Sequence, residues 1–156
     1  MRDARLAQLE AVYRREYRRF LRVAVAVLHD EDRAVDAVQE AFATAIRKRR
    51  QFRGEGTLEA WVWRMVVNAA LKESARPIHE ELADIAAAGS AQDPTTVAVA
   101  VARLPERQRL TLFLRYYADL DYRSIAAALE VAPGTVAATL NAAHTTLRRL
   151  LQEVRP

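Results

Sequence analysis

Residues 104–151 constrain the fold of this chain more than any other stretch. Within them, apolar side chains recur three and four residues apart in two runs, as on one buried face of a helix. The runs are Ile125, Ala126 and Leu129, and then Val136, Leu140, Ala143, Leu147 and Leu151. Between the runs, Pro133 and Gly134 exclude one continuous helix and favour a tight turn. The stretch therefore predicts a helical hairpin, in which the small Ala126 lets the second helix approach the first closely.

Length, charge and cysteine content narrow the class of protein. A chain of 156 residues can form one domain or two helical domains of about 75 residues each. It contains no cysteine, so disulfides, thiolate zinc sites and a cysteine nucleophile are excluded. The net charge of +4 mildly favours an acidic partner such as nucleic acid. No apolar run is long enough to cross a bilayer and the N-terminus lacks the signal-peptide pattern, so we expect a cytoplasmic protein without membrane insertion.

Two long helices are predicted in the first fifty residues. An apolar stripe from Leu6 to Val27 predicts a helix over residues 4–28. Asp30 is placed to cap a second helix that continues to about Arg50. The predicted buried face of this second helix consists of Val35, Val38, Phe42, Ala45 and Ile46. The residues expected to face outward are Asp36, Gln39, Glu40 and Ala43.

A loop with two glycines, residues 51–57, precedes a third predicted helix. Thr57 is a good N-cap for a helix that starts at Leu58, and Pro77 ends that helix. The predicted inner face consists of Leu58, Val62, Met65, Val66 and Ala69. The residues expected on the other faces are Trp61, Trp63, Arg64, Asn68 and Lys72. Of these, Trp61 is the one best suited to a core position instead.

Residues 77–94 are acidic and only weakly patterned, so we interpret them as a linker with room for a short helix. Beyond them, a helix begins near Thr96, Pro105 opens another, and Asp121 caps the first helix of the hairpin. The predicted buried side of the helix after Pro105 consists of Leu110, Phe113, Leu114 and Tyr117. The sequence therefore predicts an all-α protein of two small helical domains, residues 1–76 and 95–156, joined by the linker 77–94.

The sequence offers no reactive constellation of the kind an enzyme needs. His29, His79 and His144 are scattered without metal-ligand spacing. Gly54 and Gly56 lack the third glycine and the preceding strand of a phosphate-binding loop. The acidic run in residues 30–40 lacks the alternating oxygen ligands and central glycine of a calcium loop. We therefore expect no catalytic activity, no metal and no cofactor.

Two sets of motifs resemble one known family. LPERQR, LRYYADLDYRSIAAAL and PGTV, followed by a long final helix, resemble the fourth domain of extracytoplasmic-function (ECF) sigma factors, a group of the sigma-70 family. Earlier in the chain, DAVQEAF and QFRGEGTLEAWVWRMVVNAAL resemble the second domain of the same group. The resemblance implies a bacterial RNA polymerase sigma factor that directs promoter recognition, DNA melting and transcription initiation. The implied partners are core RNA polymerase, through its clamp and flap, promoter DNA and an anti-sigma factor.

The resemblance also implies roles for individual residues. The surface that docks on the clamp coiled coil of the largest polymerase subunit corresponds to Asp36, Gln39, Glu40 and Phe42. The residues implied to bind the melted minus-ten element are Phe52, Arg53, Thr57, Trp63, Arg64, Asn68 and Lys72. Such a set suits unpaired bases, because aromatic rings stack on bases while Arg and Lys hold phosphates. The residues implied to contact the minus-thirty-five element are Arg123, Thr135, Thr139, Asn141, Thr145 and Arg148.

The last helix departs from the family pattern. ECF relatives typically carry Lys and Arg after the GTV motif, whereas residues 137–146 contain neither. If about four cationic contacts are missing, the salt slope of DNA binding falls by roughly 0.9 for each. We therefore expect weakened or unusual recognition of the minus-thirty-five element, through a helix face that is suited to meeting another protein.

Other functions fit parts of the sequence. A sigma mimic would occupy an anti-sigma factor or polymerase without directing transcription; the uncharged last helix favours it, whereas Asn68 and the loop before Thr57 disfavour it. A helix-turn-helix repressor would bind duplex DNA without polymerase, and the DAVQEAF motif argues against it. Taken alone, the hairpin also fits two packed helices with no nucleic-acid role.

Overall fold

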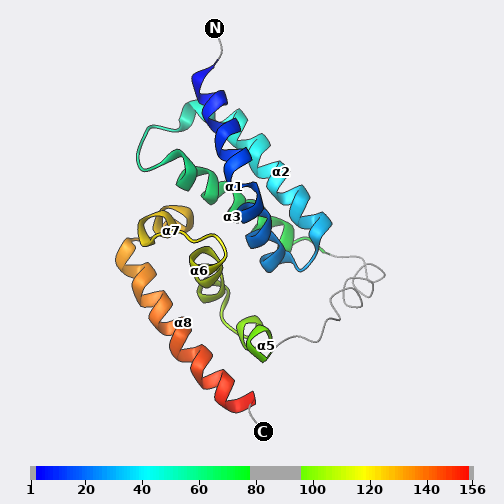
Figure 1. The fold of residues 1–156 in the computed structure, drawn as a ribbon, viewed down its shortest axis with the longest axis vertical. Helices are drawn as coiled ribbons and strands as arrows, with labels where there is room; N and C mark the ends of the chain where they lie inside the picture. Colours follow the sequence, from blue (N-terminus) through cyan, green and yellow to red (C-terminus); the bar gives the residue numbers. More distant parts are fainter. Residues whose placement is uncertain (1–2, 78–95, 155–156) are drawn as a thin grey trace.

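The structure, a computed structural model, describes residues 3–77 and 96–154, and every regular element in these ranges is a helix (Figure 1). The predicted all-α fold is therefore confirmed. The predicted linker, 77–94, lies outside the described residues except for Pro77. In chain order the elements are α1 (Ala4–Leu28), α2 (Glu31–Arg47), the 3-10 turn η1 (Arg49–Gln51), α3 (Leu58–Ser74), α5 (Thr96–Ala102), α6 (Glu106–Tyr116), α7 (Tyr122–Leu129) and α8 (Pro133–Val154).

The first three helices form a bundle in which each helix packs on the other two. Two predicted N-caps are confirmed in it. The Asp30 carboxylate accepts the backbone N–H of Arg33 at 3.0 Å, which fixes the start of α2. The Thr57 hydroxyl oxygen accepts the backbone N–H of Ala60 at 3.0 Å, which fixes the start of α3.

The buried face of α2 is made mostly of alanines. It consists of Ala34, Ala37, Val38, Ala41, Phe42 and Ala45. Val35 is only half-buried, and Ile46 is 40% exposed, so the prediction that Ile46 is buried is wrong. The alanine side chains let α1 and α3 approach α2 closely, whereas Ile46 lies in the last turn of the helix.

The predicted hairpin is confirmed in α7 and α8, which meet at a bend of 98°. The Asp121 carboxylate caps α7 by accepting the backbone N–H of Ser124 at 2.8 Å. After α7 the chain turns at Glu130, whose φ is +58°, and the N–H of Val131 bonds to the carbonyl of Ala126 at 2.9 Å. Ala126 is buried at the crossing, as its small size predicts.

The buried side of α6 differs from the prediction at one residue. Leu110, Phe113 and Leu114 are buried, but Tyr117 is 44% exposed. Because α6 ends at Tyr116, Tyr117 lies just beyond the helix, where its ring stacks on Phe113 with centroids 5.5 Å apart. Tyr117 therefore covers the edge of the core rather than filling it.

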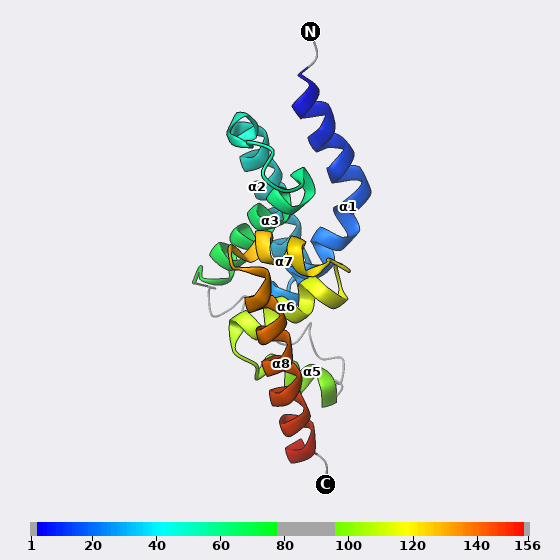
Figure 2. The same cartoon turned by 90° about the vertical axis from the view of Figure 1, so that its left-hand side faces the viewer.

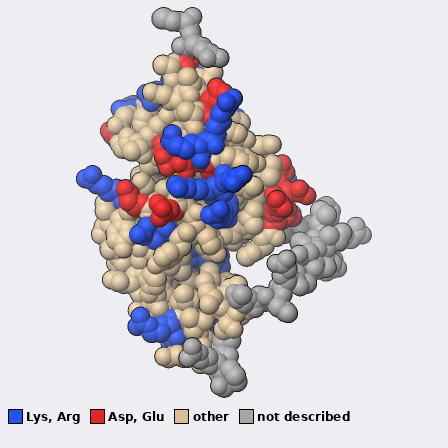
Figure 3. Space-filling view, viewed as in Figure 1, with Lys and Arg blue, Asp and Glu red and all other residues tan. Residues whose placement is uncertain are grey.

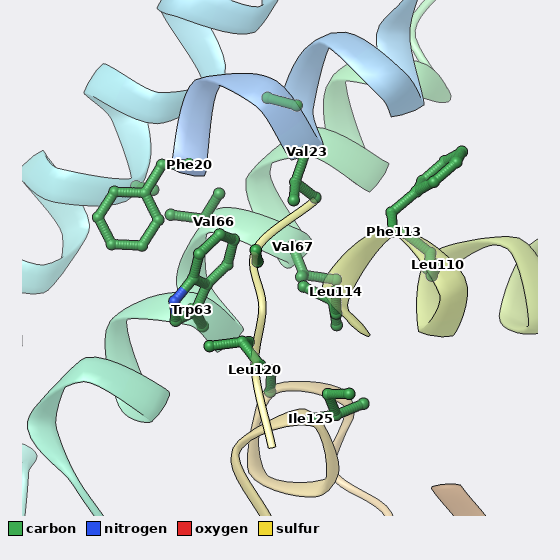
Figure 4. Close-up of a cluster of buried hydrophobic side chains, with 14 of the residues drawn as sticks. Phe20, Val23, Trp63, Val66, Val67, Leu110, Phe113, Leu114, Leu120 and Ile125 are labelled. Atoms are coloured by element: carbon green, nitrogen blue, oxygen red, sulfur yellow. The ribbon is translucent and has the colours of Figure 1, made fainter. Parts of the chain in front are cut away.

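One hydrophobic core runs through both halves of the molecule. α3 packs against α7 and α1 against α6, so the C-terminal helices lie directly on the N-terminal bundle (Figures 1 and 2). Figure 4 shows Leu120, in the turn before α7, between Trp63 of α3 and Ile125 of α7. All three side chains are buried. The two halves are thus joined by apolar packing as well as by the chain.

Within the described residues, no single helix is long and apolar enough to cross a membrane. In the part of the chain that the structure describes, only α7 and α8 taken together meet the length and composition of a span, and a bend of 98° separates them.

Candidate nucleic-acid interface

A groove of about 420 Å³ opens between α2, α3 and the end of α7; we call it the α3 groove. It brings together three residues predicted to bind the minus-ten element, Arg64, Asn68 and Lys72. Glu40, predicted to contact polymerase, lies at the same groove. The other lining residues are Thr44, Lys48, Gln51, Trp61, Met65, Ala69 and Glu130.

An aromatic pair adjoins the α3 groove. The ring centroids of Phe52 and Trp61 lie 5.6 Å apart, with the rings tilted by 56°. The guanidinium carbon of Arg5 lies 4.7 Å from the centroid of the Phe52 ring. All three side chains are half-buried, so part of each remains accessible. Trp61, which the sequence places outside the inner face of its helix but marks as the candidate for a core position, is therefore only partly buried.

The loop that leads into α3 is open at its tip. Residues 53–57 are exposed, which includes the predicted contacts Arg53 and Thr57. Gly54 and Gly56 have φ values of +81° and +75°, which disfavour any residue with a Cβ. Space is not the reason, since a Cβ at either position would meet nothing within 4 Å. The glycines thus set the path of the backbone around the exposed tip.

Two cations at the α3 groove are paired with carboxylates. Lys72 Nζ lies 3.1 Å from Glu40 Oε1. Arg64 Nη1 lies 3.3 Å from Glu130 Oε1, which reaches the groove from the end of α7. Figure 3, which shows the face seen in Figure 1, likewise has basic and acidic side chains intermixed across its middle. Both pairs are accessible to water, so each contributes little to stability and a phosphate can replace either carboxylate.

The chemistry of this surface suits unpaired bases. Phe52 and Trp61 offer partly exposed aromatic rings on which bases can stack. Asn68 is exposed in the α3 groove, and its amide can both donate to and accept from a base edge. Arg64 and Lys72 supply positive charge for the phosphates of the strand.

Trp63, predicted to bind the minus-ten element, lies in the core instead. Its side chain is 0% exposed, and its ring centroid lies 4.5 Å from that of Phe20. The prediction that it faces outward is therefore wrong. The cause is that α3 is covered on two sides, by α1 and α2 and by α7, so a residue outside its predicted inner face is buried as well.

The surface of α2 predicted to contact polymerase is largely accessible. Asp36, Gln39 and Glu40 are exposed along one side of the helix. Phe42 is only 7% exposed, and its ring packs edge-on against Tyr13 with centroids 4.5 Å apart. Its side chain therefore cannot supply contact area to a partner, which corrects that part of the prediction. Phe42 instead anchors α2 to α1.

The hairpin presents its predicted contacts at the surface. Five are exposed: Arg123, Thr135, Asn141, Thr145 and Arg148. Thr139 is half-buried, and its hydroxyl donates to the carbonyl of Thr135 at 2.7 Å. Figure 3 shows the upper part of α8 without Lys, Arg, Asp or Glu, as the sequence of residues 133–147 requires. The outer face of α8 is therefore neutral over its first half.

Several residues at this surface carried no signal in the sequence. Glu130 reaches the α3 groove only because α7 packs on α3, and Asp3 and Arg5 reach the loop only through the fold. Each contact joins residues more than forty positions apart, so no local pattern predicts it. Among the residues that the structure describes, no group of three or more His, Asp or Glu is placed to hold a metal ion.

Comparison with known proteins identifies the family of the chain. Residues 12–76 match the family Sigma-70 region 2, and residues 96–152 match the family Sigma-70, region 4. The ECF RNA polymerase sigma factor SigM of Mycobacterium tuberculosis is 32% identical over 149 residues, covering 91% of this chain and 76% of the relative. The RNA polymerase sigma-H factor of Pseudomonas aeruginosa is 28% identical over 156 residues, covering 86% of this chain and 81% of the relative.

Two solved structures share the fold. CnrH in complex with the cytosolic domain of CnrY has a TM-score of 0.72 and 19% identity, covering 94% of this chain and 89% of that chain. The sigma factor RpoE of Bartonella quintana, in complex with the anti-sigma factor NepR, has a TM-score of 0.60 and 21% identity, covering 96% and 95%. At these identities the similarity establishes the fold alone.

Region 2 followed by region 4, on an all-α fold that ends in a helix-turn-helix, defines an RNA polymerase sigma factor of the sigma-70 type. The extent of the similarity to SigM defines the group as well. The chain belongs to the ECF sigma factors. As a member of this family it binds core RNA polymerase and promoter DNA and acts in transcription initiation.

Proposed function

We propose that the α3 groove and the loop of residues 52–57 bind the unpaired strand of the minus-ten element. The observation that carries this proposal is the convergence of the Phe52–Trp61 ring pair, the Asn68 amide and two cations on one surface. Arg53 and Thr57 join them from the loop. Trp63 is left out of the proposed site because its side chain is buried.

This site would promote melting by binding only one form of the DNA. Stacking on an aromatic side chain contributes about 1–3 kcal/mol per base. A site that binds unpaired bases and not the duplex shifts the equilibrium toward the separated strands by that difference in affinity. The protein thus acts through binding, and we propose that it has no catalytic activity of its own.

We propose that Asp36, Gln39 and Glu40 dock on the polymerase clamp. This proposal is supported by the exposure of all three side chains on one side of α2. Phe42 anchors the helix from its buried side. Glu40 also pairs with Lys72 of the α3 groove. Clamp contact with Glu40 would therefore release Lys72 for a phosphate. We place this action in the cytoplasm, with polymerase.

We assign the C-terminal helices to a domain of residues 95–156, after the linker 77–94. We propose that this domain recognises the minus-thirty-five element weakly. Thr135, Asn141 and Thr145 supply hydrogen bonds to base edges, and Arg123 and Arg148 flank them. The neutral face of α8 lacks the electrostatic attraction that dominates DNA affinity. We therefore expect this domain to prefer certain base sequences while binding DNA with low affinity.

In vitro transcription from a pool of random promoters tests these assignments. Core polymerase and the purified chain are expected to enrich a minus-ten motif strongly and a minus-thirty-five motif weakly. Asn68→Ala should degrade the minus-ten motif, whereas the matched variant Asn141→Ala should affect only the minus-thirty-five motif. Enrichment of the same minus-ten motif by Asn68→Ala would contradict the proposed site.

The neutral face of α8 also supports a second function, that of a sigma mimic acting through protein contacts. A mimic binds polymerase or an anti-sigma factor and yields no transcripts from any promoter in the pool. Measurable polymerase binding together with an empty transcript pool would favour this function over promoter recognition.

We also propose that an anti-sigma factor binds a second groove, of about 410 Å³, between the end of α1, α5 and α6. Its walls are mainly apolar, and Val97 and Tyr117 are exposed there. Tyr117→Asp should then raise transcription from the protein's own promoters in cells while leaving transcription with purified polymerase unchanged. Equal reporter activity for the variant and the wild type would count against an inhibitor at this groove.

A further inference from the structure

The start of α1 is tied to the segment that leads into the loop of residues 52–57. Asp3 is the N-cap of α1, and its Oδ1 accepts the backbone N–H of Arg5 at 3.0 Å. Its Oδ2 accepts Nε of Arg49 at 2.5 Å, 46 residues along the chain. The hydrogen bond from Arg49 is the main cause that lowers the pKa of Asp3, so the carboxylate remains charged at neutral pH.

A second contact joins α1 to the loop itself. The guanidinium of Arg5 lies over the ring of Phe52, which also packs against Trp61 at the start of α3. Nη1 of Arg5 donates to the Gln8 side chain at 3.1 Å, which fixes the orientation of the guanidinium. A cation over a ring and a tilted neighbouring ring both favour one position of Phe52. Phe52 is thus held from α1 and from α3.

These contacts hold the base of the loop and leave its tip free. Residues 53–57 are exposed, and the two glycines there have open space around them. Asp3 and Arg5 both precede residue 12, where the match to Sigma-70 region 2 begins. Asp3 and Arg5 thus lie outside the segment that matches region 2, whereas their partners Arg49 and Phe52 lie within it.

We propose that Asp3 and Arg5 are positioning residues, which hold Arg49 and Phe52 so that the loop and the Phe52–Trp61 pair are arranged for bases before DNA arrives. This inference rests on the proposed minus-ten function of the same loop. Holding a binding loop in its bound arrangement reduces the entropy lost when the ligand binds. Neither residue has to touch DNA for this effect.

The test uses polymerase holoenzyme and a bubble DNA that carries the minus-ten sequence selected from the random pool. Asp3→Asn keeps a capping oxygen but loses the charge that pairs with Arg49. Arg5→Gln keeps a good helix former but loses the cation over Phe52. We expect each variant to weaken binding by roughly two- to fivefold. Arg14→Gln, which removes a cation paired with Glu10 at 2.9 Å on the same helix, should bind as the wild type does.

Two further measurements separate positioning from direct contact and from misfolding. Amide hydrogen exchange of Gln51, whose N–H bonds to the carbonyl of Lys48 at 2.8 Å just before Phe52, should be faster in both variants, while their unfolding midpoints stay close to that of the wild type. The slope of log affinity against log salt should not change, whereas loss of a direct phosphate contact by Arg5 would lower it by about 0.7.

The possible failures are distinguishable. If both variants bind the bubble DNA and exchange their amide hydrogens as the wild type does, the inference is overturned and the minus-ten site stands. A lowered salt slope in Arg5→Gln would have the same consequence. If the wild-type holoenzyme itself does not distinguish the selected bubble from a scrambled one, the proposed minus-ten function fails and the inference fails with it.

Discussion

His29 ends α1 in a conformation that suits glycine. Its φ is +54°, and its backbone N–H bonds to the carbonyl of Val25 at 2.7 Å. A side chain in this left-handed region costs about 1 kcal/mol. We therefore expect His29→Gly to raise the free energy of unfolding by about 0.5–1 kcal/mol in urea titrations. Ala43→Gly, at an exposed site inside α2, should lower it by a similar amount, and destabilisation by both variants would refute the argument.

Asp121 makes the start of α7 sensitive to acid. The backbone N–H of Ser124, and then its hydroxyl, hold the pKa of this carboxyl below its ordinary value of 3.8. The stabilisation is therefore fully present above pH 3.8 and is lost as the pH falls through the lowered folded-state pKa. Asp121→Asn, which still caps, should flatten this part of the stability profile. Asp121→Ala should lower the free energy of unfolding by about 1 kcal/mol at neutral pH. If the stability of Asp121→Asn falls at low pH as steeply as that of the wild type, the mechanism is excluded.

Caps of this kind were predictable because they are local. Asp30, Thr57 and Asp121 each bond to a backbone N–H three residues along the chain, so residue type and spacing are sufficient to identify them. Asp3 also caps a helix, through the N–H of Arg5 two residues along, yet its ion pair with Arg49 depends on how α1 and η1 pack. Local sequence contains no information about that second contact.

At the scale of elements, helix boundaries were predicted well and helix faces less well. An apolar stripe identifies the buried face only when a single side of the helix is covered. α3 is covered on two sides, which explains why Trp63 is buried and why Trp61, two residues earlier, is partly exposed. The alanines of α2 have too little apolar surface to dominate the pattern, so the sequence wrongly predicts that the larger Ile46 is buried.

The neutral outer face of α8 predicts how DNA binding responds to added charge. Ala138 and Ala142 are exposed one turn apart on that face. Replacing both by Arg should raise the affinity of the holoenzyme for promoter DNA and steepen its salt slope by roughly 1.8, twice the 0.9 expected per phosphate contact. Replacing both by Gln adds size without charge and should leave the slope as it is. If the variant with two arginines has the same salt slope as the wild type, this face of α8 does not approach DNA.

At the scale of the whole molecule, the shared core predicts that the two domains unfold together. Both tryptophans of the chain lie in α3, so their fluorescence reports the N-terminal domain. Leu120 belongs to the other domain but packs beside Trp63. Leu120→Ala should therefore lower the stability seen by tryptophan fluorescence by about 2–4 kcal/mol, with helix content lost in the same transition.

Leu6→Ala is the control for this experiment. Leu6 lies in the N-terminal domain itself but is exposed, so its truncation should lower stability by less than about 1 kcal/mol. A tryptophan transition that Leu120→Ala leaves unmoved would show that the domains unfold independently.

The docking of the two domains on each other is not predictable from the sequence. Each domain could be predicted from its own periodicity, caps and turns. Leu120 and Glu130, which reach α3 from either end of α7, lie in turns where apolar spacing has no period to follow. Contacts between domains depend on the shapes of two folded surfaces, each made by many residues, so no local sequence pattern predicts them.

The packing of α7 on α3 also bears on how the two proposed DNA-binding surfaces reach a promoter. On the DNA-binding surfaces proposed above, promoter elements about 25 base pairs apart lie roughly 85 Å apart along DNA, so α7 would have to separate from α3 before both elements are bound. A closed population of 99% would weaken the apparent affinity for an open-state partner about a hundredfold. The stability of the closed arrangement would therefore come at the expense of the affinity for a promoter. On these assignments, a substitution that loosens the core between the domains should give a protein that unfolds more readily and yet binds a promoter carrying both elements at a lower concentration.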